Sequence, residues 1–194
     1  MLVLGTTNPN KVSEFSRLLI GVPLCCLGDL DCSVDVRETG STYRENAALK
    51  ARAYAQATGH WVLSDDTGLE VPALGGAPGV YSARFAGEHA TGAENVSKLL
   101  GALEGVEQRQ ASFHCALALS DPAGRIVLES TGRLDGRILP EQKGVGGFTY
   151  DYVFFEQKSG CTLAEMPSFA VDKLSHRARA VIAIKEELLE QFSD

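Results

Sequence analysis

Residues 41–58 constrain the fold most, because they are rich in alanine and contain neither glycine nor proline. This composition predicts a long helix, since alanine favours a helix and the two residues that interrupt one are absent. Thr42 lies three residues before Glu45, which predicts a capping box at the helix start. Gly59 predicts the helix end. An apolar strand over residues 61–63 follows directly, so helix and strand alternate here.

The rest of the chain continues this alternation. Val12, Phe15 and Leu18 recur at helical spacing, whereas the sequence at 121–124 (Asp-Pro-Ala-Gly) is typical of a turn between two strands. The predicted helices span residues 11–19, 41–58, 93–103 and 177–192. The predicted strands span residues 1–4, part of 22–34, 61–63, 111–120, 125–132 and 152–155. This order predicts an α/β fold with a mixed sheet.

Length and composition bound the class of protein. The 194 residues are expected to form one domain, residues 1–194, with room for two lobes. A hydrophobic share of 44% provides a core, and a net charge of −7 argues against binding to nucleic acid polymers, which needs a broad basic face. A small anionic ligand is still compatible with this charge, because a few local donors and a cation hold one.

Cellular location is expected to be cytoplasmic. No apolar run approaches the length of a membrane span, and the first apolar stretch is too short for the core of a signal peptide. The five cysteines are odd in number and include no Cys-x-x-Cys pair, which is typical of reduced thiols.

The turn at residues 6–11 carries the first candidate chemistry. Its residues are Thr6, Thr7, Asn8, Pro9, Asn10 and Lys11. They lie between a predicted strand and a predicted helix, where backbone N–H groups and the helix dipole favour an anion. The turn therefore predicts a phosphate site, although the Walker spacing is absent. The alternative is an ordinary helix N-cap with Lys11 in solvent.

Two neighbouring acids carry the second candidate chemistry. Asp65 and Asp66 follow the predicted strand 61–63, and acids at a strand end are placed to hold a hard cation and a water. In a strand they would point to opposite sides, so at most one would act directly in catalysis. The alternative is a polar turn with an Asx cap.

Further acids lie around the start of the long helix. Glu38 sits in the preceding loop, within reach of a metal, and Glu45, Asn46 and Lys50 lie on the helix itself. Glu45 and Lys50 are not an i,i+4 pair, so simple helix pairing does not account for both. The alternative for each acid is a solvated charge or a helix cap.

Aromatic residues carry the fourth candidate site. Phe148 and Tyr150 could stack on a flat heterocycle, with Asp151 beside them. His176 and Arg177 downstream could read the edge of that heterocycle. The alternative is a pair of core aromatics, a turn aspartate and a cation at a helix start.

Taken together, these segments resemble the Ham1/inosine triphosphate pyrophosphatase family. The matching residues are Thr7-Asn8-Pro9-Asn10-Lys11, Glu38-Thr39-Gly40, Glu45-Asn46-Ala47, Ser64-Asp65-Asp66-Thr67-Gly68-Leu69, residues 74–84, Gly147-Phe148, Tyr150-Asp151, Ala164-Glu165-Met166 and Ser175-His176-Arg177. The matches are collinear over roughly residues 1–185, and this order makes the resemblance specific.

The resemblance implies an ITPase-like α/β fold with a long central mixed sheet, flanking helices and two lobes with a cleft between them. It also implies a homodimer that hydrolyses the purine nucleoside triphosphates ITP, dITP and XTP to the monophosphate and pyrophosphate with Mg²⁺. A water activated by the metal or by Asp66 would attack the α-phosphorus, and Lys11 would neutralise the leaving pyrophosphate.

The same resemblance assigns roles to residues of this chain. Residues 6–11 would bind the triphosphate, Glu38 and Asp66 would hold the metal, and Asp66 would be the general base. The remaining implied substrate contacts are Thr67, Phe148, Tyr150, Asp151, His176 and Arg177.

Four positions depart from the family pattern. Thr149 and Tyr152 replace the second Gly and the Pro of the family's Gly-Phe-Gly-Tyr-Asp-Pro, and a threonine adds bulk and removes access to glycine-only backbone angles. Val171 replaces a family lysine, and Lys173 is the candidate substitute two residues later. Thr67 replaces a serine. These changes leave two alternatives: a pyrophosphatase with shifted substrate preference, or a nucleotide-binding protein with weak catalysis.

Overall fold

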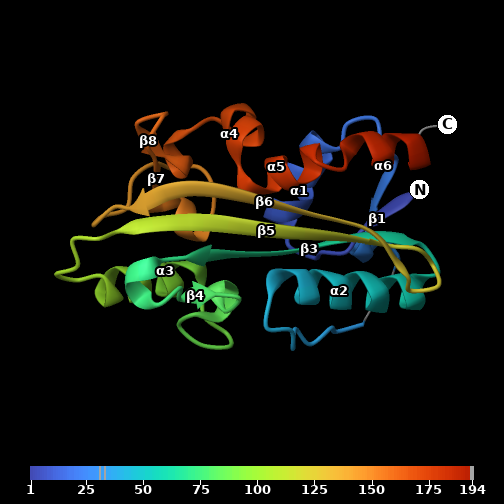
Figure 1. Ribbon diagram of the computed structural model, residues 1–194, viewed down its shortest axis with the longest axis horizontal. Coiled ribbons are helices and arrows are strands. Elements are labelled where there is room, and N and C mark those ends of the chain that lie inside the picture. Colours follow the sequence, from blue (N-terminus) through green and yellow to red (C-terminus); the bar gives the residue numbers. More distant parts are fainter. Residues whose placement is uncertain (31, 33, 193–194) are drawn as a thin grey trace. The chain divides into compact units, whose positions relative to one another are not determined.

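The computed structural model describes residues 1–30, 32 and 34–192, and the chain divides into two compact units (Figure 1). The first unit comprises Met1–Asp66, Cys115–Gly132 and His176–Asp194, as far as these are described. The second comprises Thr67–His114 and Arg133–Ser175. The single-domain assignment stays a prediction.

Eight strands form one mixed sheet. They are β1 (Leu2–Leu4), β2 (Leu24–Cys26), β3 (Trp61–Glu70), β4 (Pro78–Gly79), β5 (Gln110–Ser120), β6 (Ile126–Ile138), β7 (Phe154–Glu156) and β8 (Cys161–Thr162). Their order is β2-β1-β3-β5-β6-β7-β8, with β4 paired to β3. Strand β1 pairs in parallel with β2 and β3, whereas β7 pairs antiparallel with β6 and β8. The α/β class with a mixed sheet and flanking helices is confirmed.

Helices and 3₁₀ turns connect the strands. The α-helices are α1 (Pro9–Leu18), α2 (Tyr43–Thr58), α3 (Gly92–Ala102), α4 (Ser168–Leu174), α5 (His176–Ile182) and α6 (Lys185–Phe192). The 3₁₀ helices are η1 (Leu27–Leu30), η2 (Pro72–Leu74), η3 (Ser82–Arg84), η4 (Thr149–Tyr152) and η5 (Leu163–Glu165). No helix of the described residues combines the length and hydrophobicity that a membrane crossing requires.

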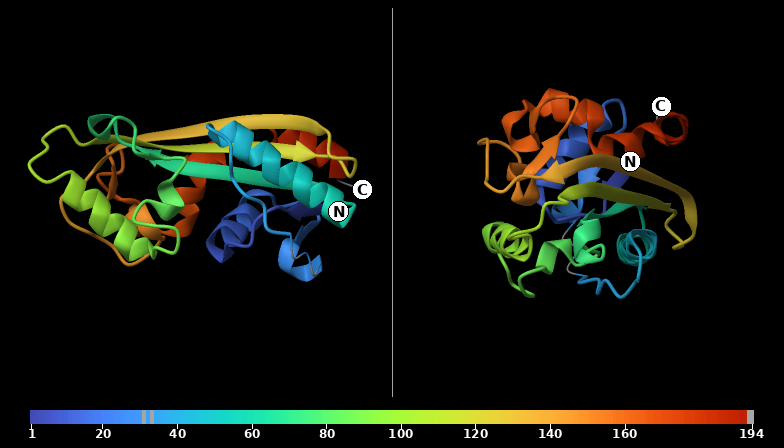
Figure 2. Two further views of the ribbon diagram at one scale, coloured as in Figure 1. Left: turned by 90° about the horizontal axis from the view of Figure 1, so that it is seen from below. Right: turned by 60° about the vertical axis from the view of Figure 1, so that its left-hand side comes forward.

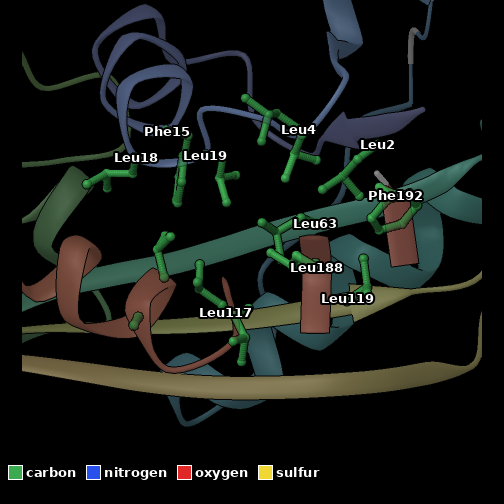
Figure 3. Packing of buried hydrophobic residues seen from close by; sticks show 14 of the residues in the cluster. Leu2, Leu4, Phe15, Leu18, Leu19, Leu63, Leu117, Leu119, Leu188 and Phe192 are labelled. Atoms are coloured by element: carbon green, nitrogen blue, oxygen red, sulfur yellow. The ribbon is translucent and has the colours of Figure 1, made fainter. Parts of the chain in front are cut away.

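The first unit has helices on both faces of its strands. In Figures 1 and 2, α2 covers one face, and α1, α5 and α6 lie on the other. Leucine and phenylalanine side chains fill the interface between the strands and helices α1, α5 and α6, as Figure 3 shows: Leu2, Leu4, Phe15, Leu18, Leu19, Leu63, Leu117, Leu119, Leu188 and Phe192. Small side chains fill the interface between α2 and the sheet, where Ala47 and Ala51 of α2 meet Ala116 and Ala118 of β5. The alanines predicted to favour a helix therefore also let α2 approach the sheet closely.

The second unit has a core of its own. Val96 and Leu99 of α3 pack with Tyr150 of η4 and Phe154 of β7 in one hydrophobic cluster. The Tyr150 hydroxyl donates to the carbonyl oxygen of Ser82 at 2.9 Å. Helix α3 therefore holds η4 in place.

Predicted helix boundaries hold where local caps decide them. Helix α2 begins after Thr42 with the predicted capping box and ends at Gly59, which adopts a left-handed backbone. Helix α1 begins at Pro9, two residues earlier than predicted, because the Asn8 side chain caps it and Pro9 suits the first helical position.

Other predictions were wrong in their bounds or missed an element. The predicted strand at 61–63 continues to Glu70 as β3, and the predicted strand at 125–132 continues to Ile138 as β6. The predicted helix at 177–192 is two helices, α5 and α6. Strand β7 begins at Phe154, because residues 149–152 form η4. Helix α4 was not predicted. The strand expected within residues 22–34 is β2; Asp31 and Ser33 lie outside the described residues.

Gly132 fixes the approach of α5 to β6. A Cβ atom there would lie 2.0 Å from the carbonyl oxygen of His176 and 2.6 Å from the nitrogen of Ala180. Both are backbone atoms, so neither can rotate away. We expect Gly132→Ala to lower the free energy of unfolding by about 3 kcal/mol, measured by chemical denaturation.

Gly28→Ala is the matched control, because a Cβ at Gly28 meets nothing within 4 Å. An equal loss of stability in both variants would contradict the close packing of α5 on β6.

Candidate functional site

Strand β3 separates the two neighbouring acids, as its alternation predicts. Asp65 contacts side chains of α1 and α5, whereas Asp66 contacts side chains of α2. All of these residues belong to the first unit. The chain therefore builds two different environments from two adjacent carboxylates.

Asp65 is fully buried and held by cations. Its Oδ2 lies 2.7 Å from Lys11 Nζ and 3.9 Å from Arg177 Nε. Burial acts to raise the pKa of Asp65, but Lys11, Lys50 and Arg177 outweigh it and lower that pKa below its ordinary value. Asp65 therefore carries its negative charge inside the protein.

Asp66 lies in a more anionic environment. Asn46 Nδ2 donates to Asp66 Oδ2 at 3.1 Å, and Lys50 Nζ lies 3.5 Å from Asp66 Oδ1. Burial, with a further contribution from the neighbouring Glu38, raises the pKa of Asp66 in spite of Lys50. A carboxylate with a raised pKa accepts a proton more readily near neutral pH.

Lys50 connects these acids. Its ammonium also contacts Glu38, and only 12% of its side chain is exposed. Burial acts to lower the pKa of Lys50, but Asp65, Asp66 and Glu38 together raise it. Lys50 is therefore a fixed positive charge among three carboxylates.

Asn46 ties the Glu38 loop to Asp66. It is fully buried, and its Oδ1 accepts from the backbone N–H of Gly40 at 2.8 Å. A Cβ at Gly40 would lie 2.6 Å from that oxygen, so only glycine lets the loop approach this closely. Glu45, in contrast, is the helix cap that the alternative interpretation expected, since it accepts from Ser41 and Thr42.

The turn at residues 6–11 is a capped helix entry. Asn8 Oδ1 accepts from the backbone N–H groups of Asn10 at 2.9 Å and Lys11 at 3.4 Å, and Thr6 Oγ1 accepts from Asn8 N–H. The N-cap of the alternative interpretation is therefore present, and it already engages these donors. The other half of that alternative, Lys11 in solvent, was wrong, because the side chain is 15% exposed and pairs with Asp65.

Arg177 is buried at the start of α5 beside His176. Its Nη1 contacts Glu14 Oε2 of α1, in addition to the longer approach to Asp65. The structure thus brings Lys11 and Arg177 together around Asp65, with Glu14 beside Arg177. It brings Glu38 together with Asp66 through Lys50, with Asn46 beside them. His176 precedes Arg177 at the start of α5, and all these residues belong to the first unit.

The remaining predicted residues belong to the second unit. Thr67 follows Asp66 on β3. Phe148 donates its backbone N–H to Asp151 Oδ2 at 3.0 Å, next to the 3₁₀ helix that contains Thr149, Tyr150 and Asp151. Lys173 lies in the last turn of α4 with its ammonium 5.9 Å from the centre of the Phe169 ring. Of the two aromatics, Tyr150 is a core residue, whereas Phe148 is only half-buried.

Thr149 adopts a left-handed backbone, with a φ of +51°. Residues other than glycine reach this region at an energetic cost, so the expectation that a threonine loses the glycine-only angles stays a prediction. A left-handed backbone costs a β-branched residue about 1–3 kcal/mol, so the surrounding contacts must hold it.

Asn46 and Lys50 received no role from the sequence. They are four residues apart on α2, beside the buried Ala47 and Ala51. Polar residues adjoining the sheet-facing stripe of a helix are a signal that could have found them.

The donors available for a metal are oxygen atoms. No group of three or more His, Cys, Asp or Glu residues that could hold a metal is found in the described part of the chain. Glu38 and Asp66 are nevertheless close enough to share Lys50. One or two carboxylates completed by substrate phosphates are the donor set that Mg²⁺ commonly uses, so these residues fit that ion.

The fold and the site define a mixed-sheet α/β protein with a buried cluster of carboxylates and cationic side chains. Residues 2–187 match the model of the Ham1 family. The chain is 45% identical over 191 residues to the dITP/XTP pyrophosphatase of Geobacter sulfurreducens, covering 96% of each chain. It is 46% identical over 190 residues to that of Geobacillus kaustophilus, covering 96% of this chain and 93% of the relative.

Solved structures agree with this match. The Staphylococcus aureus Ham1 protein superposes with a TM-score of 0.87 at 35% identity, covering 98% of each chain. A Coxiella burnetii Ham1 protein gives 0.87 at 38% identity, covering 97% of this chain and 98% of that one. The chain belongs to the Ham1 family, which confirms the resemblance.

Asp65 gives a prediction about stability. Removing its charge leaves the largely buried Lys11 without its counter-charge and takes one of two carboxylates from Arg177, so Asp65→Asn should lower the free energy of unfolding at pH 7 by about 3 kcal/mol. Because its pKa is lowered on folding, the Asp65 carboxylate stabilises the folded protein at pH values above its ordinary pKa of 3.8. This stabilisation is lost as the pH falls through the folded-state pKa. The difference between wild type and variant should therefore shrink on acidification below that value. Urea denaturation across a pH series measures it; a difference that grows in acid would contradict the pairing.

Proposed function

We infer that this chain is a nucleoside-triphosphate pyrophosphatase that hydrolyses ITP, dITP and XTP to the monophosphate and pyrophosphate. Membership of the Ham1 family and the names of its dITP/XTP pyrophosphatase relatives support this activity. The observation that carries it is the separation of Asp65 from Asp66, which pairs one carboxylate with Lys11 and holds the other beside Asn46 and Lys50.

Asp66 is the general base of the proposed reaction. It accepts a proton from a water molecule whose oxygen attacks the α-phosphorus, and the bond from that phosphorus to the leaving pyrophosphate breaks. Asn46 orients the carboxylate through Oδ2, while Lys50 lies beside Oδ1. The carboxylate is therefore held in one orientation before substrate arrives.

Positive charge for the polyphosphate comes from Lys11 at the start of α1. In phosphoryl chemistry the protein contributes chiefly positioning and charge neutralisation. The backbone N–H groups of Asn10 and Lys11 would donate to phosphate oxygens once their hydrogen bonds to Asn8 Oδ1 break. Thr67, next to Asp66, is a further proposed phosphate contact.

Mg²⁺ is the proposed cofactor, held by Glu38 and Asp66. When bound, it would neutralise charge on the phosphates. Lys50 contacts both carboxylates, so it keeps them together in the absence of other cations.

Base recognition is assigned to Phe148, Tyr150, Asp151, His176 and Arg177 on the family resemblance. Thr149 and Lys173 are proposed as further substrate-binding residues at or near positions where the chain departs from the family pattern. Hypoxanthine and xanthine carry an acceptor oxygen at position six, whereas adenine carries a donor amine there. Donors such as Arg177 and backbone N–H groups would leave an adenine amine unsatisfied and weaken its binding by orders of magnitude.

A homodimer in the cytoplasm is proposed on the same resemblance. All five cysteines are free thiols in the structure, which agrees with a reducing compartment.

Asp66→Asn tests the base. The amide cannot accept the proton, so pyrophosphate release from dITP should fall by at least about 10²-fold, while the thermal unfolding midpoint stays close to that of the wild type. Asp135→Asn is the control, because that aspartate is 70% exposed and pairs with Arg133 on β6. A near-native rate in Asp66→Asn would remove Asp66 from the base role.

A substrate panel separates the alternatives. Pyrophosphate release with Mg²⁺ should be fastest for ITP and XTP and about 10²-fold slower for ATP, with dUTP and GTP also measured. Preference for another nucleotide would indicate a shifted specificity. Release from none would favour a nucleotide-binding protein.

A further inference from the structure

Thr149 is unusual within the described chain. Among the residues that the structure describes, it is the one non-glycine residue at positive φ. A threonine here therefore adopts a backbone conformation that its β-branched side chain disfavours. Such a residue persists where its surroundings determine its conformation, and these positions cluster at functional sites.

Both neighbours of Thr149 are anchored. The backbone N–H of Phe148 donates to Asp151, and the buried Tyr150 ring donates its hydroxyl to Ser82. The backbone on each side of Thr149 is thus fixed within the second unit.

The Thr149 side chain lies against the start of α3. The three heavy atoms nearest to a Cβ built on Gly92 all belong to Thr149, with Oγ1 at 2.9 Å, Cα at 3.5 Å and Cβ at 3.6 Å. Gly92 has no positive φ, so space and not backbone freedom is what glycine provides there. The side chain at 149 occupies the room that a side chain at 92 would need.

We propose that the contact between Thr149 and Gly92 is a specificity-determining element of this enzyme. By packing against the start of α3, the Thr149 side chain fixes the positions of Phe148 and Asp151 on either side of it. The position of α3 therefore determines how these two residues contact the purine base. Thr149 and Gly92 are positioning residues in this scheme. The proposal rests on the proposed function, because it assumes that residues 148–151 contact the base.

A double-mutant cycle tests this contact. Thr149→Gly should lower the dITP-to-dGTP ratio of kcat/KM by about fivefold. A rise in KM for dITP should contribute more to this change than a fall in kcat. Gly92→Ala should lower the same ratio by about threefold, because its Cβ displaces Thr149 Oγ1. In the Thr149→Gly background, Gly92→Ala should change the ratio by less than about 1.5-fold.

Two further variants keep the result decisive. Thr149→Ala keeps the positive φ but removes the atoms that lie beyond Cβ, so it should lower the ratio as Thr149→Gly does. Gly101→Ala is the matched control on α3, because a Cβ there meets nothing within 4 Å, and it should leave the ratio unchanged. Thermal melts verify that each variant folds, and calorimetry with dIMP and dGMP measures base discrimination apart from turnover.

A purely structural contact gives a different outcome. The proposal is overturned if Thr149→Gly and Thr149→Ala leave two ratios within about twofold of the wild type: the dITP-to-dGTP ratio of kcat/KM and the dIMP-to-dGMP ratio of binding affinity. It is also overturned if Gly92→Ala has the same effect in both backgrounds. Failure of the proposed function looks different again, since the wild type itself would then release no pyrophosphate from dITP or XTP.

Discussion

The buried negative charge of Asp65 is the constraint on which the site depends. An uncompensated carboxylate in the interior is prohibitively unfavourable, so cationic side chains must come to it. Lys11 does so from α1 and Arg177 from α5. The same pairings hold the turn at residues 6–11 and the start of α5 against β3. A single charge thus brings three distant segments of sequence together at the place where a polyanion is proposed to bind.

Local signals in the sequence were sufficient for some elements. Thr42, Glu45 and Gly59 determine the two ends of α2, because a capping box and a left-handed glycine depend only on nearby residues. The α/β order and the opposite faces of Asp65 and Asp66 follow from periodicity in the same way. The family followed from motifs in a fixed order along the chain.

Other features depend on partners that are distant in sequence. The strand predicted over residues 61–63 continues to Glu70 as β3, because Lys11 and Lys50 compensate the two buried acids within it. The role of Lys50 could not be read from its own helix, because its partners lie on β3 and in the Glu38 loop. Thr149 likewise combines a left-handed backbone with a side chain that lies against Gly92, a residue distant in sequence.

The alternation of β3 has a consequence for how such a chain can change by insertion or deletion. Because side chains alternate with a period of two, losing or gaining one residue just before Asp65 would exchange the faces of the two acids. With one residue lost, Asp66 would occupy the position that faces Lys11, and Thr67 would occupy the position that faces Asn46. With one residue gained, Asp65 would face Asn46, and no carboxylate would face Lys11. A change of length by a single residue at this part of β3 would therefore remove the carboxylate from one of the two environments, although both acids remain in the sequence.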